Sequence, residues 1–366
     1  MASLQRVLLV DDEPQSVAAL ERVVGPLRTK WEARSETSPT AALALLQTEA
    51  FDVVISDMRM PEMDGAAFLA QVKTLHPGAL RVILSGQSER SAAQRAASIA
   101  HQFLPKPFPP RALVELLERR GRVTSSGPVR QLVGGIDALP STAGTLDRLE
   151  ALVREAHPSV EALTALVESE PALTLKLLQL TGSSFFGVRR HIDDVRDAVA
   201  FSVPALFEAL LASARAANAR SPEAKELDFE GFRTRAVDVA ASARKLAGES
   251  PHAGACFIAG LLHEIGKLVL AVEAPSVFDA VANKAREEQM TFEQAEEATG
   301  AAPFAHVGAA LLDSGGFPQS IVEAVARQND AHYEADYLDP TTAVRRARGR
   351  RIAPPSKPRA LSVPPA

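Results

Sequence analysis

Four short apolar segments of this chain each end in polar side chains that could serve phosphoryl transfer. Asp11 and Asp12 follow the first segment, Asp57 follows the second, and Ser85 and Lys106 follow the other two. Each segment has the β-rich composition of a short buried strand, and the stretches between them show helical spacing. Ligands of an open α/β sheet bind outside the carboxyl ends of its strands. We therefore expect these five side chains to converge on one pocket.

The chemistry that such a pocket supports is transfer of a phosphoryl group to a carboxylate. This transfer needs a hard divalent cation, an in-line acceptor and positive charge near the transferred oxygens. Asp11, Asp12 and Asp57 offer the oxygen ligands that Mg²⁺ prefers, and three clustered carboxylates repel one another until a cation binds. Lys106 could pair with one phosphate oxygen, and the Ser85 hydroxyl could donate to another.

The elements that must position these residues follow from the pattern of residues 1–122. Strand-like and helical segments alternate five times, which predicts a parallel, doubly wound five-stranded sheet of the flavodoxin-like α/β class. The strands are expected at 5–10, 30–34, 53–56, 80–84 and 102–104. The helices are expected to begin near Glu13, Ser38, Asp64, residue 88 and Pro109.

The remaining chain divides into three parts. Residues 123–135 are rich in turn formers and poor in apolar pattern, which indicates an inter-domain linker. Residues 136–332 show one helical pattern after another with almost no β-rich run, which predicts an all-α domain. Residues 333–366 are rich in Pro and Arg with few large apolar side chains, so we expect a disordered basic tail.

Composition limits the class of protein. The chain has 366 residues, 46% of them apolar and 23% charged, with a net charge of −5. These ordinary values favour a soluble globular protein and give no sign of a membrane or nucleic-acid partner. The single cysteine, Cys256, excludes an internal disulfide framework. Met1–Arg6 lacks the features of a signal peptide, and charges interrupt every apolar run, so we expect a cytoplasmic protein.

The segment from residue 5 to about residue 120 resembles the receiver domain of bacterial two-component response regulators. Four separate strings carry this resemblance, and they occur in the order of that family. They are Val10-Asp11-Asp12-Glu13-Pro14, Asp57-Met58-Arg59-Met60-Pro61-Glu62-Met63-Asp64-Gly65, Leu84-Ser85-Gly86 and Leu104-Pro105-Lys106-Pro107-Phe108. The resemblance implies that the domain is phosphorylated by a sensor histidine kinase and uses Mg²⁺.

The same resemblance implies roles for individual residues. Asp57 would be the phospho-acceptor, and Lys106 and Ser85 would contact the phosphoryl group. Asp11, Asp12, Asp57 and the main-chain carbonyl of Arg59 would hold the metal. Phe103 stands at the aromatic switch position, so its side chain would rotate as Ser85 moves toward the phosphate.

The helical half holds a second cluster that could do chemistry, Leu261-Leu262-His263-Glu264-Ile265-Gly266-Lys267, with His306 further along the chain. Histidines and acids from several helices can hold divalent metals and activate water. A His-Glu pair in Leu and Ile surroundings is more often a buried, hydrogen-bonded pair. The pattern alone leaves both interpretations open.

The wider context of that cluster resembles the HDOD domain, a relative of the metal-dependent HD and HD-GYP phosphohydrolases. The matching strings are Asp137-Ala138-Leu139-Pro140, Glu170-Pro171-Ala172-Leu173, Ser183-Ser184-Phe185-Phe186-Gly187, Ala259 to Gly266, His306 to Leu312 and Phe317-Pro318. In this chain the name-giving acid is Glu264 instead of Asp. Thr234 or Arg235 stands where a first histidine ligand belongs, and Gln328-Asn329-Asp330 replaces paired histidines.

These departures argue against a hydrolase function for this domain. His263, Glu264 and His306 remain as ligands, Lys267 matches a catalytic lysine, and the charge of Arg235 would oppose a bound cation. We therefore expect no cofactor in this half and a helical protein-interaction module, in which the site residues persist as buried hydrogen-bonded structure.

The combined expectation is a cytoplasmic bacterial response regulator whose phosphorylation at Asp57 switches a non-catalytic HDOD output domain toward a downstream protein. A different class remains as the alternative: a receiver-regulated, metal-dependent phosphodiesterase acting on a cyclic dinucleotide. A third class, nucleic-acid binding, would rest on the arginines of the tail (Arg345, Arg346, Arg348, Arg350 and Arg351) and is not expected. The sequence is compatible with a homodimer but does not specify one.

Overall fold

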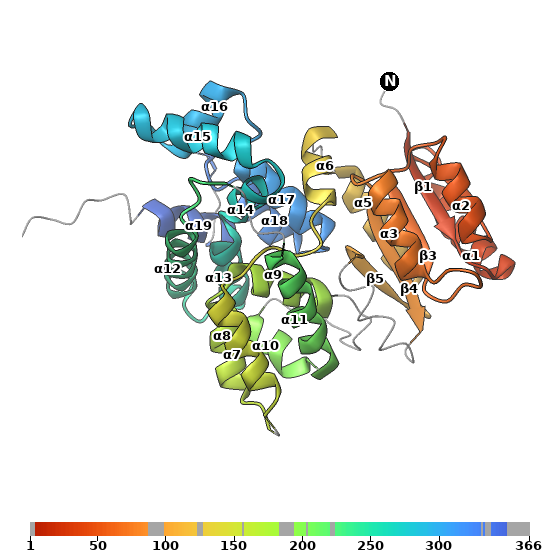
Figure 1. The fold of residues 1–366 in the computed structure, drawn as a ribbon, viewed down its shortest axis with the longest axis horizontal. Helices are drawn as coiled ribbons and strands as arrows, with labels where there is room; N and C mark the ends of the chain where they lie inside the picture. The colour runs from red at the N-terminus through yellow and green to blue at the C-terminus, as the bar shows by residue number, and fades with distance from the viewer. Residues whose placement is uncertain are drawn as a thin grey trace, which may run out of the picture.

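The computed structural model describes residues 4–86, 99–122, 127–155, 157–182, 194–202, 204–219, 224–330, 332–333 and 338–349. Figure 1 shows an N-terminal sheet flanked by helices, joined through one short helix to a larger all-helical body. The two parts lie side by side, and the edge of the sheet that carries strand β5 faces the helical part.

The N-terminal part is a five-stranded parallel sheet in the order β2-β1-β3-β4-β5. The strands are β1 Gln5–Val10, β2 Trp31–Glu36, β3 Val53–Asp57, β4 Leu80–Gly86 and β5 Gln102–Lys106. The helices around it are α1 Pro14–Val24, the 3₁₀ turn η1 Gly25–Leu27, α2 Pro39–Leu46, α3 Gly65–Leu75 and α5 Pro110–Arg122. The predicted doubly wound sheet is confirmed, and the helix expected near 88–98 falls outside the described residues.

Alternation along the strands explains how the sheet buries both of its faces. Val7 and Leu9 of β1 pack in one apolar cluster with α1 and α5. Leu8 and Val10 belong to another cluster, which includes α2 and α3 and continues into the helical part. Successive side chains of a strand point to opposite faces, so each strand contributes to both clusters. The sheet therefore shares a core with the second domain on one face only.

The second part is helical throughout the residues that the structure describes. Its elements are α7 Ala143–Val153, α8 Val160–Glu168, α9 Pro171–Gly182, α10 Val195–Phe201, α11 Pro204–Asn218, α12 Phe229–Ala247, α13 Ala253–Leu262, α14 Ile265–Glu273, α15 Pro275–Glu287, α16 Phe292–Thr299, α17 Phe304–Ser314, α18 Gln319–Ala326 and α19 Pro340–Gly349. The prediction of an all-α domain is confirmed for these residues.

Helices α13 and α14 form the centre of this domain. The stretch Ala253–Glu273 is long and apolar enough to cross a membrane, but 89% of its most apolar window is buried inside the protein. A helix that is apolar on all sides is typical of the core of a large domain. The stretch is therefore a core element, because helices α12, α17, α18 and α19 cover it.

The predicted linker is partly helical, which composition did not indicate. Helix α6, Gly127–Gly134, occupies most of residues 123–135 and packs against α14 and α17. Val129 and Val133 lie four residues apart and are 5% and 1% exposed. Two apolar residues at that spacing cover one turn of a helix, too little to stand out among the neighbouring glycines and serines. Tertiary packing, and not local propensity, decides this helix.

The predicted disordered tail is wrong for ten of its residues. Helix α19, Pro340–Gly349, packs against α12, α13 and α18. Its buried side chains include Ala343, Val344 and Ala347. The arginines between them made the segment look like a solvated basic tail. They point away from the apolar stripe or pair with acids, as Arg348 does with Glu293 of α16 at 2.7 Å.

We expect Val344→Ala to lower the free energy of unfolding by about 2 kcal/mol, because Val344 is fully buried and loses two carbon atoms of packing. Urea unfolding measures the change. Arg346→Ala, an exposed position on the same helix, is the matched control and should change stability by less than about 0.5 kcal/mol. Equal, small effects of both variants would show that α19 does not belong to the core.

Candidate functional site

Three of the predicted phosphoryl-transfer residues meet at the carboxyl ends of β1, β3 and β5. The Lys106 ammonium donates to Asp11 Oδ2 at 2.6 Å and also to Asp57 Oδ1. Asp11 and Asp57 are 1% and 7% exposed, and the Lys106 side chain is 32% exposed. The lysine therefore bridges two carboxylates at the mouth of a largely buried acidic pocket.

The backbone holds both carboxylates in place. Asp57 Oδ2 accepts from the main-chain N–H of Arg59 at 2.6 Å, and Asp11 Oδ1 accepts from that of Glu13 at 3.0 Å. Gly65 begins α3 directly beside the end of β3, where a Cβ would lie 2.1 Å from the Asp57 carbonyl oxygen. Only glycine permits this approach, so the loop between Asp57 and Gly65 can fold tightly over the pocket.

Burial and charge oppose each other at Asp57. Burial raises the pKa of the Asp57 carboxyl, and Asp11 adds to that rise, while the hydrogen bond and charge of Lys106 act against it. Burial alone would lower the pKa of Lys106, but its bonds to Asp11 and Asp57 outweigh burial and raise it. The lysine is thus firmly charged, and the acid that would accept a phosphoryl group lies in a partly desolvated environment.

The other predicted residues of this site lie as follows. Asp12 follows Asp11 and is half-buried. The backbone of Ser85 pairs with that of Pro105 in the β4–β5 ladder, which places it at the same sheet end as Lys106; its side chain falls outside the described part. Phe103 is 4% exposed, so the predicted switch residue lies in the buried cluster that the sheet shares with the helical domain.

The donor set of this pocket suits Mg²⁺. Asp11 and Asp57 offer carboxylate oxygens on either side of the Lys106 ammonium, and Asp12 follows directly in sequence. Oxygen donors are the ligands that Mg²⁺ prefers. In the described residues no three His, Cys, Asp or Glu side chains stand in a ready metal-binding arrangement. In this pocket the Lys106 ammonium occupies an oxygen of each of two carboxylates, so a metal would compete with the lysine for them.

The second candidate site, in the helical domain, is filled by the protein's own cations. Glu264 is 6% exposed, and Lys267 Nζ donates to its Oε1 at 2.5 Å. Arg235 Nε donates to its Oε2 at 3.1 Å, which agrees with the prediction that Arg235 stands near this acid. Lys267 also lies over the rings of Phe292 and Phe304, 4.8 and 4.5 Å from their centres. Both oxygens of the acid are thus already occupied.

The electrostatics of this site reflect that pairing. Burial alone would raise the pKa of Glu264, but the charges of Lys267 and Arg235 hold it well below its usual range. Burial lowers the pKa of His263 to about 4, with Arg348 and Lys267 acting in the same direction. His263 Nδ1 lies 2.6 Å from the Gly260 carbonyl oxygen, which can only accept, so this nitrogen carries the proton. At neutral pH the site holds a neutral histidine and an ion-paired glutamate.

His306 and the replacement residues complete the comparison with a metal site. His306 is exposed on α17, whereas His263 is 2% exposed. Gln328, which stands where a histidine ligand was expected, is buried, and its Nε2 donates to the His263 and Val325 carbonyl oxygens. Among the described residues, His263, Glu264 and Lys267 come together, and nothing places His306 with them.

Sequence reasoning missed a cluster of charges between the domains. Asp137 Oδ1 accepts from Arg81 at 3.2 Å and its Oδ2 accepts from Lys73 at 2.5 Å, while Lys176 Nζ donates to its carbonyl oxygen at 2.8 Å. Arg81 is 0% exposed. The signal that could have revealed this cluster is a charged residue within the apolar run of β4, because a fully buried arginine requires a partner.

Two family models match the chain: the response regulator receiver domain over residues 7–118, and the HDOD domain over residues 139–331. Among solved structures, the MmoQ response regulator of Methylococcus capsulatus is similar in fold, with 23% identity and a TM-score of 0.50. That similarity covers 60% of this chain and 89% of MmoQ. Both resemblances expected from the sequence motifs are confirmed.

Curated relatives are similar over a part of this chain. The hydrogenase transcriptional regulatory protein HoxA of Bradyrhizobium diazoefficiens is 38% identical over 115 residues, which is 31% of this chain and 23% of HoxA. The DNA-binding transcriptional regulator NtrC of Salmonella typhimurium is 32% identical over 157 residues, which is 39% of this chain and 32% of NtrC. Each match thus spans less than a third of the relative and less than half of this chain.

Proposed function

We propose that this chain, which belongs to the HDOD family and carries a receiver domain at its N-terminal end, is a bacterial response regulator with a non-catalytic output domain. The receiver match and the similarity to HoxA and NtrC support phosphorylation-dependent signalling. The finer proposal is that a sensor histidine kinase donates the phosphoryl group to Asp57. The HDOD domain then presents or hides a surface for a downstream protein.

The observation that carries this proposal is the Lys106 bridge between Asp11 and Asp57. In phosphoryl transfer the protein mainly supplies position and charge. The Asp57 carboxylate, held by the Arg59 N–H, would attack the phosphorus of a phosphohistidine on the kinase. The bond from phosphorus to the histidine nitrogen would break, and Lys106 would neutralise a transferred oxygen. A bound Mg²⁺ would supply further positive charge on these oxygens. After transfer, the ammonium of Lys106 faces a dianionic group in place of a single carboxylate oxygen.

The same geometry contains a switch. A phosphoryl group adds charge and three acceptor oxygens, so Lys106 gains a stronger partner than either carboxylate. Phe103 lies three residues before Lys106 on β5, in the cluster shared with the output domain. A change in how Lys106 is paired therefore acts on a strand whose side chains reach the domain interface.

The output domain is proposed to be non-catalytic because two cationic side chains of the same domain neutralise Glu264. A hydrolytic metal centre needs open positions and free carboxylate oxygens. Here Arg235 and Lys267 occupy both oxygens of Glu264, and Gln328 fills a ligand position. We therefore propose that the domain acts by binding a downstream protein at its surface.

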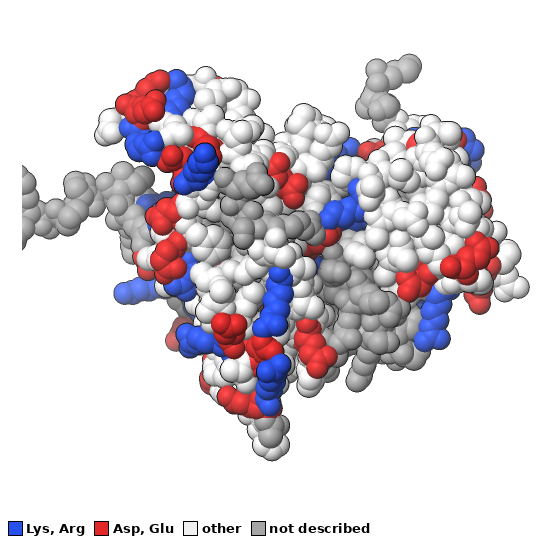
Figure 2. Space-filling view, viewed as in Figure 1, with Lys and Arg blue, Asp and Glu red and all other residues white. Residues whose placement is uncertain are grey.

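The proposed location is the cytoplasm, and no nucleic-acid partner is proposed. On the face shown in Figure 2, basic and acidic side chains are interspersed and form no continuous basic stripe. Proteins that bind nucleic acid non-specifically carry such a stripe or patch. Residues 340–349 of the segment that was expected to be a basic tail form α19 in the core, where Arg348 is paired with Glu293. Arg350 and Arg351 lie outside the described residues.

The test of the receiver is phosphoryl labelling of the full chain. With acetyl phosphate and Mg²⁺, we expect the wild type to gain one phosphoryl group by intact mass and Asp57→Ala to gain none. Asp147→Ala, which removes an exposed aspartate on α7, is the matched control and should be labelled like the wild type. Labelling of Asp57→Ala to the same extent would remove Asp57 from its proposed role.

The test of the output domain is metal content and hydrolysis. Purified protein is expected to contain no stoichiometric Mn, Fe or Ni and to leave cyclic dinucleotides intact, with or without phosphodonor. Stoichiometric metal together with hydrolysis that is lost in His263→Ala would replace this proposal by the receiver-regulated phosphodiesterase.

A further inference from the structure

The two domains share an apolar cluster, and polar contacts also join them. Two groups of these polar contacts differ in character. The first, here called the hinge cluster, consists of Lys73, Arg81, Gly134, Asp137 and Lys176. Arg81 is fully buried and donates to the Gly134 carbonyl at 2.9 Å as well as to Asp137. Arg81 and Lys176 are buried, and Asp137 and Lys73 are 12% and 22% exposed. Opening the hinge cluster would therefore leave the buried charge of Arg81 without its carboxylate partner.

The second attachment, here called the latch, joins β5 and α5 to the end of α17. Gln102 Nε2 donates to the Ser314 carbonyl at 2.9 Å, and Arg119 donates to the Gly316 carbonyl at 3.4 Å. Gly316 has φ +76°, and a Cβ there would meet the Gln102 side chain at 3.3 Å. A left-handed glycine therefore shapes the turn so that the glutamine fits against it. Two hydrogen bonds from partly exposed side chains hold less strongly than the hinge cluster.

Strand β5 connects the phosphorylation pocket to the latch. Lys106 ends this strand in the pocket, and Gln102 begins it at the latch. β5 is an edge strand that pairs with β4 alone, so it can shift at the cost of fewer ladder bonds than any inner strand. Phe103, next to Gln102, is buried in the apolar cluster that continues into the helical domain. A displacement of Lys106 can thus move the five-residue strand β5 and reach the interface between the two domains at Gln102.

We infer that phosphorylation of Asp57 opens the latch while the hinge cluster stays closed, so that the receiver turns about Arg81 and frees the end of α17. This inference rests on the proposed function, because it takes the phosphoryl group on Asp57 as the trigger. The ammonium of Lys106 moves toward the phosphoryl oxygens, β5 shifts with it, and the amide of Gln102 leaves the Ser314 carbonyl.

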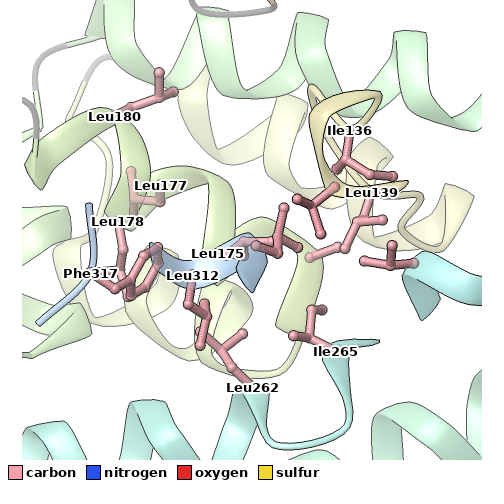
Figure 3. Close-up of a cluster of buried hydrophobic side chains, with 14 of the residues drawn as sticks. Ile136, Leu139, Leu175, Leu177, Leu178, Leu180, Leu262, Ile265, Leu312 and Phe317 are labelled. Atoms are coloured by element: carbon pink, nitrogen blue, oxygen red, sulfur yellow. The ribbon is translucent and has the colours of Figure 1, made fainter. Parts of the chain in front are cut away.

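Helix α17 carries the change into the output domain. The latch turn at its end continues into Phe317, which lies in the same buried cluster as Leu177 and Leu312 (Figure 3). At its other end, Phe304 packs over Lys267 at 4.5 Å and its N–H donates to Glu296 at 2.7 Å. One helix therefore joins the latch to the ion-paired site around Glu264, and its release alters the surface that a partner would meet.

Hydrogen exchange of the full chain tests the latch. The reporters are the amides of Gly315 and Phe317, which donate to the Leu311 and Leu312 carbonyls at 3.0 and 3.1 Å. Phosphorylation is expected to raise their exchange rate by about tenfold. Gln102→Ala is expected to give the same rise without phosphodonor and no further rise with it. Gln319→Ala, an exposed glutamine on α18 outside the interface, is the matched control and should behave like the wild type.

Intact mass measured on the same samples separates the possible failures. If the wild type gains a phosphoryl group and the exchange of the turn is unchanged, the latch is wrong while the proposed function stands. If no phosphoryl group is gained, the proposed function falls and the latch falls with it. If Gln102→Ala leaves the turn protected and phosphorylation still raises exchange, the contact made by Gln102 is not the latch.

Discussion

Replacing Arg81 with methionine is expected to lower the free energy of unfolding of the receiver domain by about 3–5 kcal/mol. Arg81 is 0% exposed and donates to the carbonyls of Ile99 and Gly134, both at 2.9 Å, and to Asp137 at 3.2 Å. Burial lowers its pKa to about 10, which Asp137 opposes, so the side chain stays charged at neutral pH. Methionine fills similar space but leaves two carbonyls and part of a carboxylate without donors.

The matched control is Arg130→Met. Arg130 of α6 also pairs with an aspartate, here Asp52 of the receiver, at 2.9 Å, but the two side chains are 26% and 28% exposed. Solvent screens such a pair, so its loss should cost no more than about 1 kcal/mol. The two variants thus remove similar ion pairs that differ in burial.

Urea unfolding followed by fluorescence measures both variants. The chain has one tryptophan, Trp31, which is 2% exposed in the receiver, so the signal reports unfolding of that domain. A double variant, Arg81→Met with Asp137→Leu, isolates the coupling between the two side chains. If Arg81→Met costs no more than Arg130→Met, the hinge cluster does not hold the domains together.

The receiver could be predicted from the sequence in detail because its evidence is local. Asp11, Asp57 and Lys106 each follow an apolar strand, and the rule that ligands lie at the carboxyl ends of parallel strands placed them together. In the structure Lys106 contacts both Asp11 and Asp57, as that rule predicts. What motif reasoning did not supply is that Lys106 bridges both carboxylates, since this depends on side-chain geometry.

The errors occurred where tertiary contacts decide the outcome. Helices α6 and α19 each bury only a few small or branched side chains, so their periodicity is weak. The position of His306 shows the same limit: it lies between Ala305 and Val307, which are buried, yet faces outward. Which side of a helix meets the core depends on neighbours far away in sequence, and a single chain does not reveal them.

Acidification provides the second large effect. As the pH falls from 7 to 4, His263 is expected to cost the protein about 3 kcal/mol of stability. Burial holds the pKa of His263 at about 4 in the folded protein, against 6.5 for the exposed side chain. A histidine with a depressed pKa binds a proton more readily in the unfolded chain. Its contribution is therefore complete above pH 6.5 and is lost as the pH falls toward 4.

The measurement is the slope of unfolding free energy against pH, compared between the wild type and His263→Gln. The variant loses packing at every pH, but only a change of slope between pH 6.5 and 4 reports the titration of His263. His306→Gln, at the exposed histidine of α17, should keep the slope of the wild type. Carboxylates contribute to all three curves alike and cancel in the difference. If His263→Gln keeps the slope of the wild type, the imidazole is not held neutral by burial, and the interpretation of this site as a filled, metal-free core loses its basis.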